Sequence, residues 1–150
     1  MSKQPILLVD DNADDVELTV KSLRAAHLAN PIEIARDGAA ALDYLFGEGA
    51  FRERAIAVQP ALVLLDLDLP KIPGLRVLER MREDERTKHV PVVIVTSSRD
   101  QDNAVRGQSL GIHAFIQKPV DFDAFRDAAR RLRLSWAVQE NPPEPMRGRS

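Results

Sequence analysis

The sequence predicts an α/β fold, a doubly wound five-stranded parallel sheet flanked by five helices. Short, wholly apolar runs recur along the chain, which is typical of strands that are buried on both faces. Segments with apolar residues at helical spacing separate these runs. This alternation favours parallel strands with helices on both faces of the sheet. At 150 residues, the chain is expected to form one domain with a substantial core.

The expected strands are five short segments that are apolar or nearly so: 6–9, 32–35, 62–65, 92–95 and 114–117. The expected helices lie between and after them: 12 to about 26, 39–46, one from 75 that ends within the charged stretch 82–88, 100–110, and a last one from about 121. Residues 47–60 form an irregular or partly helical insertion.

Prolines end the predicted domain. Pro142, Pro143 and Pro145 follow one another closely, and a segment of this kind cannot continue a helix. The sequence therefore predicts a domain over 1–138 and an extended, proline-rich C-terminal tail over 139–150.

Composition excludes several classes of function. The chain has no cysteine, so disulfides, cysteine-ligated zinc and thiol nucleophiles are excluded. The formal net charge of −2 gives no general attraction to nucleic acid or to an anionic membrane. No apolar run approaches the roughly 20 residues of a membrane span, and the N-terminus lacks a signal-peptide pattern. We expect a cytoplasmic protein that binds neither nucleic acid nor membrane.

Acidic and other polar residues follow the expected strands. Asp10 and Asp11 follow the first strand, Asp66 the third, Thr96 the fourth and Lys118 the fifth. Parallel strands bring their carboxyl ends to one edge of the sheet, where ligands bind in such folds. Three carboxylates at one edge repel one another unless a cation joins them, and their oxygens suit Mg²⁺.

These residue types together point to phosphoryl transfer. Mg²⁺, a lysine and a hydroxyl can stabilise a phosphoryl group in transfer, and an aspartate can accept it as an aspartyl-phosphate. Simpler interpretations remain open from the residues alone. Asp10 and Asp11 can serve as helix caps, Asp66 can cap a turn, and Thr96 can be a strand-end turn residue.

Four motifs at the expected strand ends carry a resemblance to a known family. They are Val9-Asp10-Asp11, the run from Leu64 to Pro70 with Gly74, Val95-Thr96-Ser97, and Phe115 followed by Lys118-Pro119. In this order they resemble the response-regulator receiver domain of two-component signalling, over about residues 5–138. The resemblance implies a flavodoxin-like sheet with strand order 2-1-3-4-5.

The resemblance also implies a phosphoacceptor and a metal site. Asp66 would accept phosphate from a histidine kinase. Asp10 and Asp11 would hold Mg²⁺ together with Asp66, and the backbone carbonyl of Asp68 would complete the protein ligands.

A second implied group forms the switch. Lys118 would pair with the phosphoryl group, Thr96 would hydrogen-bond it, and Phe115 would turn inward when Thr96 moves. The face formed by the fourth helix, fifth strand and fifth helix would then change its affinity for a partner.

Other features resemble the single-domain regulators that partner phytochrome-type kinases. They are the insertion with Tyr44-Leu45 and Gly49 before the central strand, the string Leu69-Pro70-Lys71, and a last helix that reaches Trp136. This resemblance implies a bacteriophytochrome-type histidine kinase as partner. It also implies a homodimer formed through the fourth helix–fifth strand–fifth helix face, the C-terminal tail, or both.

The function predicted is therefore a phosphoacceptor switch, with no enzymatic activity beyond self-phosphotransfer and autodephosphorylation. An alternative is a haloacid-dehalogenase-like aspartyl phosphatase, because Asp66-Leu67-Asp68 resembles the Asp-x-Asp nucleophile of that family. Those enzymes carry a second acidic pair downstream of the nucleophile, whereas Asp10-Asp11 lies upstream. Flavin binding on the same fold is disfavoured, because the acidic first loop would repel the flavin phosphate.

Overall fold

The structure is a computed structural model. It describes residues 4–25, 30–51, 59–67, 69, 71–96, 114–118, 123 and 126. Within these residues the chain forms one parallel sheet whose strand order is β2-β1-β3-β4-β5. Its strands are β1 (Ile6–Val9), β2 (Ile32–Ala35), β3 (Leu62–Asp66), β4 (Val92–Thr96) and β5 (Ala114–Gln117).

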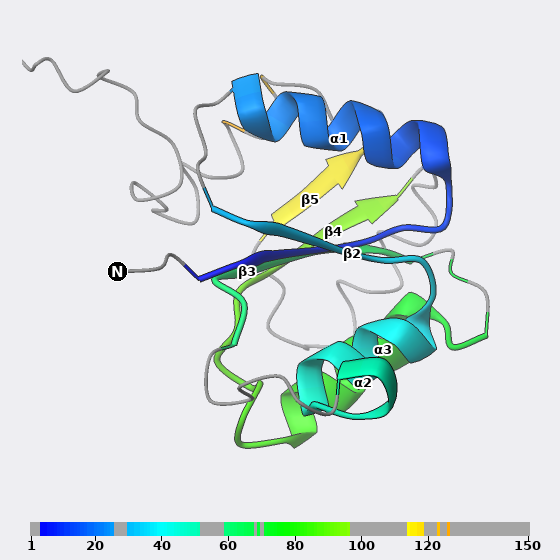
Figure 1. Cartoon of the computed structure of the whole chain (residues 1–150), viewed down its shortest axis with the longest axis vertical. Coiled ribbons are helices and arrows are strands. Elements are labelled where there is room, and N and C mark those ends of the chain that lie inside the picture. The colour runs from blue at the N-terminus through cyan, green and yellow to red at the C-terminus, as the bar shows by residue number, and fades with distance from the viewer. Residues whose placement is uncertain are drawn as a thin grey trace, which may run out of the picture.

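Helices cover both faces of the sheet (Figure 1). The described helices are α1 (Ala13–Ala25), α2 (Gly38–Phe46) and α3 (Gly74–Glu83), with one 3-10 turn, η1 (Gly49–Phe51). Figure 1 shows α1 on one face, and α2 and α3 side by side on the other. None of these described helices has the length and apolar character that a membrane span requires.

The central strands are apolar throughout because both of their faces are buried. All residues of β1, β3 and β4 are buried. Alternate residues, such as Leu7, Val63 and Ile94, pack in one core with α2 and α3. Since successive side chains of a strand point to opposite faces, Leu8 and Leu64 face the side that α1 covers. A polar side chain fits such a strand only at its end.

Local sequence explains where α1 begins. Asn12 precedes the helix, and its side-chain oxygen accepts a hydrogen bond of 2.9 Å from the Asp15 N–H. Asn12 thereby acts as the N-cap, satisfying one of the N–H groups that a helix start leaves unpaired. Val16 and Leu23 form part of the buried side of the helix.

The start of α2 is joined to the loop between β3 and α3. Asp37 caps α2 by accepting from the Ala40 N–H at 2.7 Å, and it pairs with Lys71 at 3.3 Å. The Ala40 hydrogen bond lowers the pKa of Asp37; burial opposes this effect and Lys71 adds to it. Lys71 has a φ of 68°, a conformation that is unusual outside glycine. Next to it, a Cβ added to Gly38 would lie 2.1 Å from the Ile72 carbonyl oxygen.

The fold predicted from sequence is confirmed. The five strands lie where expected, and β3 and β4 extend one residue further, to Asp66 and Thr96. Within the predicted insertion at 47–60, η1 is helical and 52–58 lie outside the described residues. The helices predicted at 100–110 and from 121, and the tail at 139–150, also lie outside them, apart from the helical residues 123 and 126.

Gly38→Ala tests the contact between α2 and the β3–α3 loop. Replacing glycine by alanine within a helix normally stabilises it by about 0.5–1 kcal/mol. Here the added methyl group would collide with backbone, so we expect the free energy of unfolding to fall by about 1–3 kcal/mol. Urea denaturation followed by circular dichroism measures the change, and its sign decides between the two effects. A stabilised variant would contradict the close approach.

Candidate functional site

The strand register places the acidic and hydroxyl residues at the same level, at the carboxyl edge of the sheet. Val9 pairs with Leu65, so Asp10 and Asp66 follow on neighbouring strands. Asp66 is in turn paired with Val95, the residue before Thr96. The Asp10 N–H donates to the Ala35 carbonyl at 3.0 Å, which extends the pairing of β1 by one residue. The parallel topology therefore places these acids together, as the sequence predicted.

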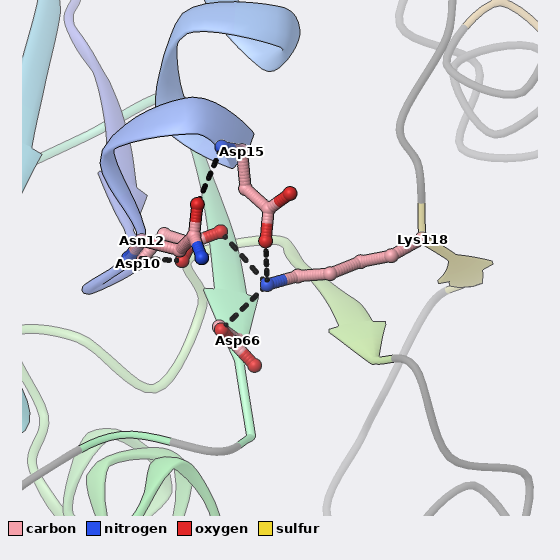
Figure 2. A network of polar contacts seen from close by, with 5 residues as sticks. All are labelled: Asp10, Asn12, Asp15, Asp66 and Lys118. Carbon is pink, nitrogen blue, oxygen red and sulfur yellow. Dashed lines mark hydrogen bonds and ion pairs between the residues drawn. The ribbon is translucent and has the colours of Figure 1, made fainter.

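One ammonium group joins the acids. Lys118 follows β5 and reaches back across the strand ends (Figure 2), and its backbone N–H donates to the Thr96 carbonyl at 2.9 Å. Its Nζ lies 2.9 Å from Asp66 Oδ2 and 3.2 Å from Asp10 Oδ2. Both carboxylates have side chains that are only 3% exposed. Buried carboxylates of this kind need a cation or hydrogen bonds to remain charged.

Burial and pairing act on Lys118 in opposite directions. Removal from water by itself lowers the pKa of Lys118. Hydrogen bonds to Asp15 and Asp66, with the charges of Asp66 and Asp10, outweigh burial and raise the pKa above its usual range. Lys118 therefore carries its positive charge at any physiological pH.

The acids also form a set that suits a divalent cation. Asp10, Asp11 and Asp66 each offer a carboxylate oxygen, and these oxygens lie within 4.8 Å of one another. Octahedral Mg²⁺ with bonds of about 2.1 Å needs ligand oxygens no more than about 4.2 Å apart. Small side-chain adjustments would close this difference. Asp11 is exposed, so one side of this set faces solvent, where water ligands could remain.

Thr96 lies beside this cluster. It is the last residue of β4, it is 1% exposed, and its backbone pairs with Gln117, the residue before Lys118. The position is the one predicted from sequence, at the strand end next to Asp66.

The loop after β3 is held close to the strand by a glycine. Gly74, the first residue of α3, donates to the Leu67 carbonyl at 3.2 Å. A Cβ added to Gly74 would lie 2.3 Å from the Asp66 carbonyl oxygen. The start of α3 thus packs directly against the backbone that carries Asp66.

Asp15 is a member of the cluster that the sequence interpretation did not include. Its Oδ2 lies 2.8 Å from Lys118 Nζ, and Figure 2 shows the carboxylate pointing from α1 toward the ammonium. In the sequence, Asp15 is one of several acids that favour a helix start. An acid three residues after an N-cap residue is a recognisable signal, but it normally predicts a contact with the cap itself.

Two predicted participants cannot be placed. Asp68 lies outside the described residues. The backbone of Phe115 belongs to β5, where it pairs with Ile94, but its side chain also falls outside the description. The metal role of Asp68 and the switch role of Phe115 remain predictions.

Comparison with known proteins identifies the family. The model of the response regulator receiver domain matches residues 6–130. The chain therefore belongs to the response-regulator receiver domain family, as its motifs indicated. Membership of that family disfavours the haloacid-dehalogenase alternative.

The relatives include regulators linked to phytochromes. The structure of the bacteriophytochrome response regulator AtBRR is similar with a TM-score of 0.85 and 45% identity, covering 94% of this chain and 100% of that one. The Mn²⁺-bound form of response regulator Rcp1 has a TM-score of 0.73 at 28% identity, covering 93% and 97%. Rcp1 of Synechocystis sp. is 33% identical over 113 residues, 75% of each chain. The predicted resemblance to phytochrome-linked regulators is confirmed.

A further relative is the probable methanogenesis regulatory protein FilR2 of Methanothrix harundinacea. It is 35% identical over 141 residues, which are 93% of this chain and 88% of FilR2.

Lys118→Met tests whether the ammonium holds the buried acids together. Without a divalent cation, the variant would lack the positive charge that lies between the Asp10 and Asp66 carboxylates, and the free energy of unfolding should fall by about 3 kcal/mol. Saturating MgCl₂ should restore much of this loss, because a bound cation can replace the ammonium charge. Urea denaturation with and without MgCl₂ measures both effects.

Lys21→Met provides the matched control. Lys21 is exposed on α1, and its contact of 3.5 Å with Glu17 is exposed too, so its loss should change stability by less than about 0.5 kcal/mol. An equal loss for Lys118→Met with and without magnesium would contradict cation binding by the acids.

Proposed function

We propose that this protein is a single-domain response regulator that accepts a phosphoryl group on Asp66 from a histidine kinase. The observation that carries the proposal is the buried Asp66 carboxylate at the end of β3, in contact with Lys118 and within the set of three acids. Membership of the receiver family supports the same reaction.

Asp10, Asp11 and Asp66 would hold the Mg²⁺ ion, with the backbone carbonyl of Asp68 as a further ligand. Their clustered oxygens support this assignment, as does the solved Mn²⁺-bound form of the relative Rcp1. When bound, the ion would neutralise negative charge on the transferring phosphoryl group.

The chain's own residues would carry the transfer. A carboxylate oxygen of Asp66 attacks phosphorus, the bond from phosphorus to the kinase histidine nitrogen breaks, and the electron pair returns to that nitrogen. Lys118 already lies 2.9 Å from Asp66, so its ammonium can pair with a phosphoryl oxygen that arrives there. The reaction is a single phosphoryl transfer. Its product is the phosphorylated protein itself, and no separate substrate is turned over.

The conformational change would extend from Thr96 to the face formed by the predicted fourth helix, β5 and the predicted fifth helix. Thr96 would hydrogen-bond the phosphoryl group, and Phe115 would move with it. Conversion of the Asp66 carboxylate into an acyl phosphate adds about one negative charge and three strong acceptor oxygens, so it favours whichever conformation brings Thr96 and Lys118 to the phosphoryl group. Binding of a partner to this face would read out the change.

The partner kinase is proposed to be a bacteriophytochrome, because AtBRR and RtBRR, both bacteriophytochrome response regulators, are each 45% identical to this chain. We place the reaction in the cytoplasm, where ATP supplies the kinase with phosphate. The output would be formation of a homodimer or binding of a second protein. The contact would use the face formed by the predicted fourth helix, β5 and the predicted fifth helix, the tail at 139–150, or both.

Asp66→Asn tests the phosphoacceptor. With MgCl₂ and acetyl phosphate as a small phosphodonor, the wild-type chain should gain one phosphoryl group by intact mass, and the variant should gain none. Asp14→Asn removes an equal charge from an exposed position of α1 and should still be labelled. Undiminished labelling of Asp66→Asn would overturn the assignment.

Mass in solution tests the dimer. Light scattering should give a dimer for the full chain, with a dimer fraction that changes when beryllium fluoride mimics the phosphoryl group. A truncation after Gln139 should weaken the dimer if the tail contributes to it. A monomer under every condition would refute the proposed homodimer.

A further inference from the structure

We propose that Asp15 is a positioning residue for Lys118, which holds the ammonium on the α1 side of the acid cluster so that Asp10 and Asp66 can bind a divalent cation. This inference rests on the proposed function, because it concerns the same metal site. It adds a fourth carboxylate, from the first turn of α1, to the residues that control that site.

The geometry singles out Asp15 among the three partners of Lys118. Its distance to Nζ of 2.8 Å matches that of Asp66 at 2.9 Å and is shorter than that of Asp10 at 3.2 Å. Asp10 and Asp66 are among the acids that could hold the cation, whereas Asp15 is not. Its side chain is also 33% exposed, so it can accept the full ammonium charge at a lower cost of desolvation than its buried neighbours.

The first turn of α1 leaves the Asp15 carboxylate available for this contact. In a capping box, an acid three residues after the N-cap folds back onto the N-cap N–H. Here the Asn12 N–H donates instead to Asp10 Oδ1 at 3.0 Å. The Asn12 side chain fixes the Asp15 backbone at 2.9 Å, and the Asp15 carboxylate extends toward Lys118 (Figure 2).

A bound divalent cation would compete with Lys118 for the same carboxylates. The ammonium contacts one oxygen each of Asp10 and Asp66, and the remaining Asp10 oxygen accepts from Asn12. Two positive charges that share these acids repel each other. Asp15 offers the ammonium a partner outside the metal set, which reduces the repulsion without exposing Lys118 to water.

Direct titration with Mn²⁺ tests the inference without any phosphoryl transfer. Electron paramagnetic resonance of free Mn²⁺ would give the dissociation constant for the full-length chain. We expect Asp15→Asn to weaken Mn²⁺ binding by about tenfold, at the lower end of the effect of residues that support metal ligands. Asp14→Asn, the exposed neighbour with the same charge, should change binding by less than about twofold because salt screens it.

A double-mutant cycle separates positioning from simple charge. In a Lys118→Met background there is no ammonium to hold, so Asp15→Asn should then change Mn²⁺ affinity no more than Asp14→Asn does. Asp15→Glu, which keeps a carboxylate, should recover part of the lost affinity in the chain that retains Lys118.

The results that would contradict the inference differ from those that would contradict the proposed function. Wild-type affinity in Asp15→Asn, or the same tenfold loss with and without Lys118, would overturn the role of Asp15 alone. Absence of Mn²⁺ binding by the wild-type chain would overturn the metal site and this inference together.

Discussion

The contact between the Lys118 ammonium and the buried carboxylates of Asp10 and Asp66 is the interaction on which the candidate site depends. The two acids belong to neighbouring strands and are almost entirely removed from water. Their mutual repulsion would oppose folding if no positive charge lay between them. Lys118 comes from far along the chain, so this pairing requires β5 to be in place beside β4.

The architecture of the sheet decides where such a cluster can exist. Because β1, β3 and β4 are buried on both faces, a charged side chain within them would face a hydrocarbon core. The strand ends are the first positions where polar groups can meet one another and solvent. Parallel pairing in register then brings these ends to the same level. The acids converge because of strand topology, although they are separated by tens of residues in the sequence.

Much of this could be predicted from sequence because it follows from pattern and topology. The apolar runs at 6–9 and 62–65 predicted buried strands, and their parallel order predicted that Asp10, Asp66 and Lys118 would meet. The role of Asp15 could not be predicted in this way. The direction of the Asp15 side chain depends on which carboxylate accepts the hydrogen bond from the Asn12 N–H. Asp10 and Asp15 can both compete for it, and their spacing in the sequence does not decide between them.

The contacts at Gly38 and Gly74 hold the backbone at and after Asp66 rigidly against the starts of α2 and α3. At both positions a glycine brings a helix start against backbone, at the Ile72 and Asp66 carbonyls, with no space for even a methyl group. Close-packed backbone of this kind has little compressibility. Because Leu65 packs with α2 and α3, the side chain of Asp66, the next residue of the strand, points to the opposite face of the sheet. A group attached to Asp66 would therefore act on that face, while the backbone behind it is held rigidly by the two glycine contacts.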